Sequence, residues 1–112
     1  MTLSEKQKLF TRLVAKLIEF AYEQGYGLTF GEAWRPPEMA AIYAKQGKGI
    51  KNSLHTKRLA VDFNLFIDGE YCTKSEDYMM LGAYWESLHP LCQWGGRFND
   101  GNHFSMEHEG VK

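Results

Sequence analysis

Two short clusters of histidine and acidic residues have the residue types that bind and use a metal ion. His55 and Asp62 stand seven positions apart, and Asp100 and His103 stand three positions apart near the end of the sequence. Two imidazoles and one carboxylate are enough to hold a catalytic zinc, which takes three protein ligands and keeps one position open. Asp100 could then take a proton from the attacking water and pass it to a leaving amine. The clusters therefore predict a zinc-dependent hydrolase.

Each of these residues also has a simpler explanation. A single histidine near a strand is more often a hydrogen-bonded surface residue than a ligand. Asp62 stands in an otherwise apolar stretch, where a buried carboxylate needs a partner, and Arg58 or Lys57 would supply one. Asp100 lies in Asn-Asp-Gly, a typical turn sequence. The combined spacing of the clusters, rather than any one residue, favours the metal site.

The composition predicts one folded domain over residues 1–112. The hydrophobic fraction is 44%, and the chain contains seven Phe, six Tyr and three Trp, enough for a core. A bound metal would further stabilise so small a domain. The net charge of −1 provides no broad basic surface, so we expect no nucleic-acid partner and a monomeric protein.

The N-terminus and the cysteines bear on the compartment. The first residues begin a polar, amphipathic stretch, and no apolar run reaches the length of a signal region or a membrane span. We therefore expect synthesis in the cytoplasm without a signal peptide, and no stable membrane association. Cys72 and Cys92 fit no zinc-finger spacing, and we expect free, packed thiols, with a cysteine ligand as the minor alternative.

The first half of the chain predicts two helices and an extended segment. Ser4 and Gln7 match a capping box, and Gly25 and Gly27 would end the helix. The apolar residues between them recur at helical spacing: Leu9, Phe10, Leu13, Val14, Leu17, Ile18 and Ala21.

Residues 28–34 read as extended. Pro36 and Pro37 would open a short helix that runs to about Lys45, and residues 46–53 would form a polar loop leading to the first cluster.

The second half predicts a small sheet. Residues 59–65 alternate between apolar side chains for the core and a second set, including Asp62, for a cleft. Asp68-Gly69 predicts a hairpin turn, with residues 70–72 returning. Ser75 would cap a helix that ends before Pro90.

The chain would finish with a turn at residues 99–101 and a strand over residues 102–107, with His103 and Ser105 on one face. The predicted fold class is α+β: a small antiparallel sheet packed with about three helices.

Three motifs in chain order resemble the VanY-like D-Ala-D-Ala carboxypeptidase family of zinc peptidases, which includes bacteriophage L-alanyl-D-glutamate endolysins: Ser53-x-His55, Ala60-x-Asp62 and Asp100-x-x-His103. That family's pattern reads Ser-x-His-x-x-Gly-x-Ala-x-Asp, followed later by Glu or Asp three residues before a final His. Trp34-Arg35 and the helix after it also match, so the resemblance spans residues 28–107. It implies a hedgehog/D-Ala-D-Ala peptidase-like fold.

The resemblance also implies roles for individual residues. His55, Asp62 and His103 would bind Zn2+, and Asp100 would be the general base. Arg35 would stabilise the oxyanion or bind a substrate carboxylate, although it also reads as a surface arginine before a helix.

Ser53 would hydrogen-bond the substrate, with a loop cap as its alternative. The family's Gly is replaced here by Arg58, so the loop between the first two ligands could be built differently.

The resemblance further implies a substrate, the peptidoglycan stem peptide. The first expectation is an L-alanyl-D-glutamate endopeptidase from a phage or prophage, acting in the periplasm or cell wall after release. The second is a D-Ala-D-Ala carboxypeptidase. The alternative without enzymatic activity is a zinc-stabilised cell-wall-binding or phage structural module, which would not need the extra carboxylate of Asp100.

Overall fold

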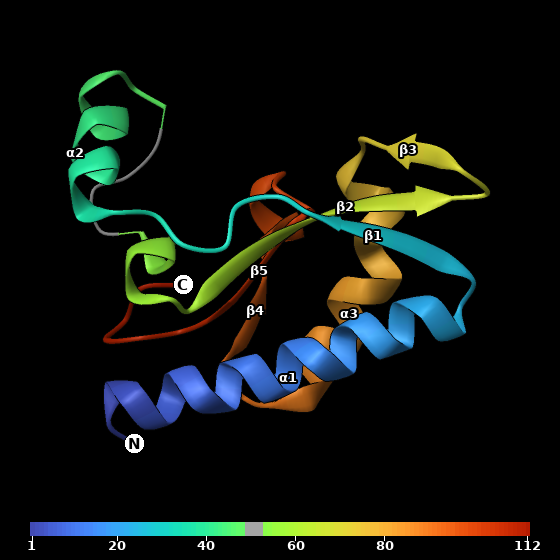
Figure 1. Cartoon of the computed structure of the whole chain (residues 1–112), viewed down its shortest axis with the longest axis horizontal. Helices are drawn as coiled ribbons and strands as arrows, with labels where there is room; N and C mark the ends of the chain where they lie inside the picture. The colour runs from blue at the N-terminus through green and yellow to red at the C-terminus, as the bar shows by residue number, and fades with distance from the viewer. Residues whose placement is uncertain (49–52) are drawn as a thin grey trace.

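A five-stranded antiparallel sheet with helices packed against it forms the framework of the chain, in a computed structural model that describes residues 1–48 and 53–112 (Figure 1). The helices and strands in chain order are α1 (Leu3–Glu23), β1 (Tyr26–Phe30), α2 (Pro37–Lys45), β2 (Ala60–Ile67), β3 (Glu70–Cys72), α3 (Met79–Leu88), β4 (Cys92–Trp94) and β5 (His103–Met106). Three short 3-10 helices join them: η1 (Leu54–Lys57), η2 (Ser75–Tyr78) and η3 (Gly95–Phe98). The predicted α+β class, with about three helices, is confirmed.

Strand β2 is the centre of the sheet. The strand order is β1-β2-β5-β4, and β3 pairs with the C-terminal half of β2. Phe30 of β1 lies opposite Phe63, and Asp62 lies opposite His103 of β5. The sequence did not predict β4, because three residues are too few for a pattern of alternation.

The core lies between the sheet and the two longer helices. Helix α1 packs against α3 and β1 (Figure 1), through buried residues at helical spacing: Phe10, Leu13, Leu17 and Ala21. From α3, the fully buried Trp85 donates its indole N–H to the backbone carbonyls of Ser105 and Gln93 at 3.0 and 3.2 Å. This buried donor ties α3 to both β5 and β4.

The helix starts differ from the predicted caps. The capping box of α1 is formed by Thr2 and Glu5, two residues earlier than the predicted Ser4 and Gln7. Ser75 does not cap its helix either. Its hydroxyl accepts a hydrogen bond from the backbone N–H of Gly101 at 2.9 Å, and the helix is split into η2 and α3. Ser75 therefore holds the turn that precedes β5.

The turn between β2 and β3 forms where the sequence predicts it. The predicted hairpin at Asp68-Gly69 is confirmed, and both residues have positive φ, 53° and 80°. This conformation matches the twist of the paired strands β2 and β3.

Helix α2 projects from the rest of the molecule (Figure 1). Residues 49–52 of the predicted polar loop lie outside the described residues. In the ranges described, we find no helix with both the length and the apolar character that a bilayer span requires.

The packing of Trp94 on α3 generates a stability prediction. A methyl group on Gly82 would lie 2.1 Å from Trp94 Cδ2. Gly→Ala normally stabilises a helix, but here overpacking should reverse the sign and lower the free energy of unfolding by about 1–3 kcal/mol. Chemical denaturation of Gly82→Ala measures this. In a Trp94→Leu background the loss should shrink, and an equal loss in both backgrounds would contradict the steric explanation.

Candidate metal centre

The register of β2 and β5 brings Asp62 and His103 together. The backbone of Asp62 makes its hydrogen bonds to the segment that follows β1. Its N–H donates to the carbonyl of Glu32, and its carbonyl accepts the N–H of Gly31, each at 2.8 Å. Asp62 and His103 therefore form a non-hydrogen-bonded pair, in which facing side chains lie close. His103 Nδ1 lies 3.1 Å from Asp62 Oδ1.

His55 reaches the same carboxylate from η1, just before β2. Its Nε2 lies 3.4 Å from Asp62 Oδ1, and its ring is 3% exposed. Its Nδ1 lies 3.4 Å from the backbone carbonyl of Ala33. With a metal bound, a proton on Nδ1 shared with this carbonyl would leave the lone pair of Nε2 free to bind the ion.

The three side chains fit a metal ion. One ligand atom from each of His55, Asp62 and His103 lies within 4.8 Å of the other two. Ligands about 2.05 Å from a tetrahedral zinc are about 3.3 Å apart. The two nitrogen–oxygen separations of 3.1 and 3.4 Å lie on either side of that value. Two imidazoles and a carboxylate also suit zinc better than magnesium or calcium.

Asp62 and His55 shift each other's pKa values. Burial alone would raise the pKa of Asp62, but hydrogen bonds from His103 and His55 outweigh it and lower that pKa to about 2. Burial alone would lower the pKa of His55, but the Asp62 carboxylate outweighs it and raises that pKa above its ordinary value. Asp62 is therefore satisfied by the two histidines. The alternative partner Arg58 instead stacks on the Trp34 ring, with its guanidinium carbon 4.4 Å from the ring centroid.

Arg58 adopts a backbone conformation that usually favours glycine. It caps η1 in the left-handed conformation, with φ 56° and ψ 36°. A non-glycine residue there costs on the order of 1–2 kcal/mol. The stacking of its guanidinium on Trp34 offsets part of that cost. The loop between His55 and Asp62 thus keeps a positive-φ residue at the position where a Gly was expected.

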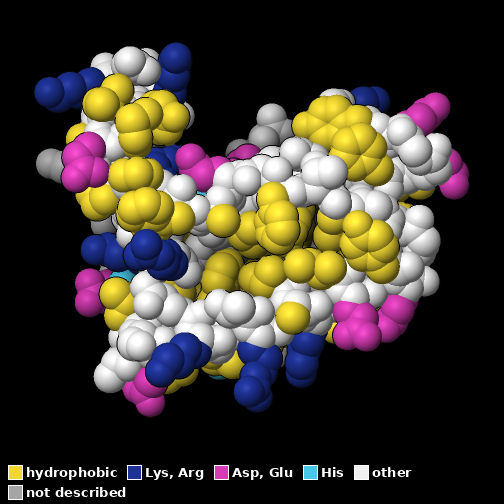
Figure 2. Space-filling model, in the orientation of Figure 1, with side chains coloured by type: hydrophobic (Ala, Val, Ile, Leu, Met, Phe, Trp, Pro, Cys, Tyr) yellow, Lys and Arg dark blue, Asp and Glu magenta, His cyan; other side chains and the backbone are white. Residues whose placement is uncertain are grey.

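Asp100 lies on the wall of the cleft that contains the three ligand candidates. The cleft has a volume of about 390 Å³. It is lined by Arg35, Lys48, Ser53, Leu54, His55, Asp62, Gly95, Phe98, Asp100, His103 and Lys112. Figure 2 shows a hollow between the α2 region and the sheet, with acidic and basic side chains along it. The structure therefore brings the four residues of the two sequence clusters to one cavity.

A close backbone approach holds Asp100 beside His103. A Cβ on Gly95 would lie 2.3 Å from the carbonyl oxygen of Asp100 and 2.9 Å from His103 Cβ. The Asp100 carbonyl also accepts the N–H of His103 at 3.1 Å. Because only glycine fits at position 95, the turn that carries Asp100 can fold directly against the ligand strand.

Arg35 is held at the cleft rather than on the open surface. Its guanidinium pairs with the carboxylate of Glu32 and lies 5.3 Å from the centroid of the Tyr43 ring. Its Nε is buried and has no hydrogen-bond partner within the described part of the chain. Its backbone N–H donates to the carbonyl of His55 at 3.2 Å, which connects the α2 segment to the site.

Sequence reasoning missed Glu32. Its carboxylate lies 3.7 Å from His55 Nδ1 as well as pairing with Arg35, so it connects the two. The only signal was its spacing of three residues from Arg35, which is weak in a segment without helical periodicity. Ser53, by contrast, caps η1: its hydroxyl accepts the N–H of His55 at 3.2 Å, and it also lines the cleft.

The fold is shared with a known peptidase. The chain superposes on the crystal structure of the Serratia marcescens L-Ala D-Glu endopeptidase ChiX with a TM-score of 0.74. The two sequences are 16% identical, and the match covers 93% of this chain and 85% of that one. No protein-family model and no curated protein matches the sequence. At this identity the comparison establishes the fold, and the chemistry must be argued from the site.

The raised pKa of His55 predicts that metal affinity falls on acidification. Protonated imidazole cannot bind a metal, and proton uptake by His55 begins above pH 6.5, the ordinary histidine value. Asp62, with a pKa of about 2, stays ionised from pH 8 to pH 6 and adds nothing to the change. Zinc titrations against a calibrated chelator at pH 8, 7 and 6 measure the effect.

Two variants serve as controls for the zinc titrations. His103→Ala should bind zinc weakly at every pH, because it removes one of the three ligand candidates. Asp77→Asn, an exposed carboxylate outside the metal cleft, should behave like the unchanged protein. Equal zinc affinity at pH 8 and pH 6 would contradict the role of His55.

Proposed function

We propose that the protein is a zinc-dependent peptidoglycan peptidase that cuts the L-Ala–D-Glu bond of the stem peptide. The observation that carries the proposal is the convergence of His55, Asp62 and His103 in a cleft with a further carboxylate, Asp100. A purely structural metal site has no need of that carboxylate. The fold shared with the L-Ala D-Glu endopeptidase ChiX supports the choice of bond.

The site's own residues suit peptide hydrolysis. A zinc ion bound by the three ligand candidates would polarise the scissile carbonyl and favour the ionisation of water. Asp100 is exposed on the cleft wall, and it would accept the proton of the attacking water and return it to the leaving amine. The hydrogen bond to Ala33 and the pairing with Asp62 keep the His55 ring in one orientation.

Arg35 supplies positive charge for the same reaction. It lines the cleft, and its planar fork can bind an oxyanion or a carboxylate at two points. Glu32 fixes one side of the guanidinium, while the buried Nε has no hydrogen-bond partner among residues 1–48 and 53–112. We propose that Arg35 stabilises the negative charge that develops on the scissile carbonyl.

We further propose a phage or prophage endolysin that acts as a monomer in the periplasm or cell wall. Its test is lysis of outer-membrane-permeabilised cells by the purified protein, with and without a chelator. Mass spectrometry of fragments released from purified peptidoglycan separates the two peptidase candidates. Cleavage between L-Ala and D-Glu supports the proposal, and release of terminal D-Ala alone would favour a carboxypeptidase. Metal binding without any fragments would favour a binding module.

Asp100→Asn should keep the metal and the fold but lose activity by about a hundredfold to ten-thousandfold. The asparagine has nearly the same shape but cannot accept the proton. Peptide release per zinc-loaded protein measures the loss, with metal content checked by elemental analysis. Asp77→Asn, which makes the same chemical change at an exposed position, should keep full activity. Near-normal turnover in Asp100→Asn would move the base role to another carboxylate, with Glu32 next to test.

Arg35→Lys should lower kcat on the order of tenfold to a hundredfold, with little change in KM. Lysine keeps the charge but loses the planar fork, so a contact made in the transition state would be weakened. Steady-state kinetics on a soluble stem peptide measure both constants. Arg12→Lys on the exposed surface of α1 is the matched control. A rise in KM alone would assign Arg35 to substrate binding, and no change would remove it from the site.

A further inference from the structure

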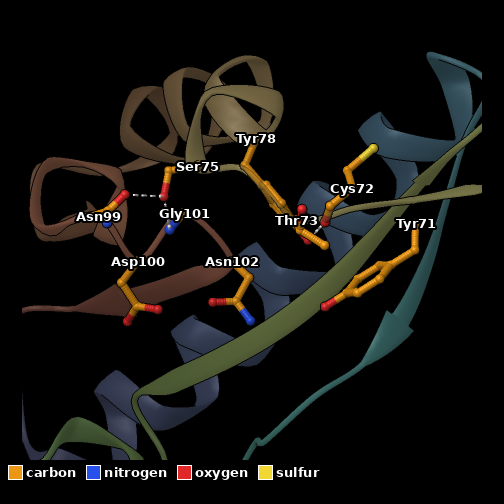
Figure 3. A pocket seen from close by; sticks show the side chains of 9 residues that line it. All are labelled: Tyr71, Cys72, Thr73, Ser75, Tyr78, Asn99, Asp100, Gly101 and Asn102. Carbon is orange, nitrogen blue, oxygen red and sulfur yellow. Dashed lines mark hydrogen bonds between the residues drawn. The ribbon is translucent and has the colours of Figure 1, made fainter.

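A second pocket has Asp100 in its wall (Figure 3). It has a volume of about 180 Å³ and shares Asp100 with the metal cleft. It is lined by Tyr71, Cys72, Thr73, Ser75, Tyr78, Asn99, Asp100, Gly101 and Asn102. Because Asp100 lines both cavities, a substrate that extends past the Asp100 side chain in both directions would occupy both of them.

The second pocket is polar but contains few charges. Apart from Asp100, its lining consists of hydroxyl, amide, thiol and backbone groups. Ser75 and Tyr78 are already engaged, Ser75 with Gly101 and Tyr78 with the backbone of β2 and β3. The side chains of Thr73 and Asn102 make no hydrogen bond to the described residues, and Figure 3 shows the Asn102 amide beside the Asp100 carboxylate. These two side chains are therefore available to a ligand.

The metal cleft has the opposite character. Three cationic side chains line it: Arg35, Lys48 and Lys112. The carboxylates of Asp62 and Asp100 offset part of this charge, and a bound zinc would add two more positive charges. An anionic group of a ligand would thus be favoured on the metal side of Asp100. An uncharged group with hydrogen-bonding atoms would be favoured in the second pocket.

The stem peptide is also charged on one side and uncharged on the other side of its L-Ala–D-Glu bond. The carboxylates of the stem lie on the D-Glu side of the L-Ala–D-Glu bond. On the other side, L-Ala is joined through a lactoyl amide to an uncharged muramic sugar. We propose that the second pocket is a subsite for this uncharged lactoyl and sugar portion, held by Thr73 and Asn102.

This inference rests on the proposed function and sharpens it. The boundary between the uncharged pocket and the cationic cleft lies at Asp100, the residue proposed to act on the scissile bond. A D-Ala–D-Ala bond has no uncharged sugar beside it, so the pair of cavities favours the endopeptidase.

Two substrates with the same scissile bond test the subsite. One is the dipeptide muramoyl-L-Ala-D-Glu, and the other is the same dipeptide with an N-acetyl group in place of the lactoyl sugar. The zinc-loaded protein should cut the muramoyl form with a kcat/KM on the order of tenfold higher. Thr73→Val and Asn102→Leu, which keep side-chain size, should each reduce this ratio by about two- to tenfold, because each removes one hydrogen bond.

A matched control separates this effect from general damage. Thr11→Val makes the same change as Thr73→Val at an exposed position outside both cavities and should leave the ratio unchanged. Equal cutting of the two substrates by the unchanged protein would overturn the subsite. So would a loss in the pocket variants that is equal for both substrates.

Binding without turnover distinguishes failure of the subsite from failure of the proposed reaction. Calorimetry gives the affinity of the uncut muramoyl and N-acetyl peptides for the same variants. If neither peptide is cut but tight binding of the muramoyl form depends on Thr73 and Asn102, the subsite stands and the proposed reaction falls. If Thr73→Val and Asn102→Leu bind both peptides as the unchanged protein does, the subsite falls.

Discussion

The pairing register of β2 with β5 is the constraint on which the candidate site depends. It sets Asp62 directly opposite His103 in a pair whose backbone groups point away from each other, so the side chains meet. A slip of one residue would turn His103 to the other face of the sheet. Trp85 opposes such a slip, because its buried N–H bonds to carbonyls on β4 and β5 at once. Core packing and metal-site geometry are therefore fixed by the same contacts.

The residue proposed to move protons is positioned by other means. Asp100 belongs to no strand, and two backbone approaches hold its turn: Gly95 beneath its carbonyl and Ser75 bonded to the neighbouring Gly101. Its carboxylate stays exposed between two cavities. The ligand candidates thus sit on rigid elements, and the carboxylate sits where a substrate can reach it. This division would let one domain hold a metal and still present an acid–base group to a substrate.

The sequence predicted what depends on residue type and short-range spacing. The α1 and β2 patterns, the Asp68-Gly69 turn and the grouping of His55, Asp62 and His103 all have strong local signals. The starting cap of α1, the short strand β4 and the role of Ser75 were wrong or missed. The α1 cap is a local pair, Thr2 with Glu5, that competes with an equally plausible pair two residues later. The strand β4 and the role of Ser75 are decided by contacts between distant segments, such as Ser75 with Gly101. The ion pair of Glu32 with Arg35 at the site likewise depends on how the α2 segment meets η1.

The two cysteines differ in a way that offers experimental access to the second pocket. Cys92 is buried, and burial raises the pKa of its thiol to about 12, so it stays protonated and unreactive near neutral pH. Cys72 is free and only partly buried, and it belongs to the pocket beside Asp100. A thiol-directed fluorophore would therefore label Cys72 selectively. The native chain thus carries a single attachment point for a reporter of the environment at that wall, without any engineered cysteine.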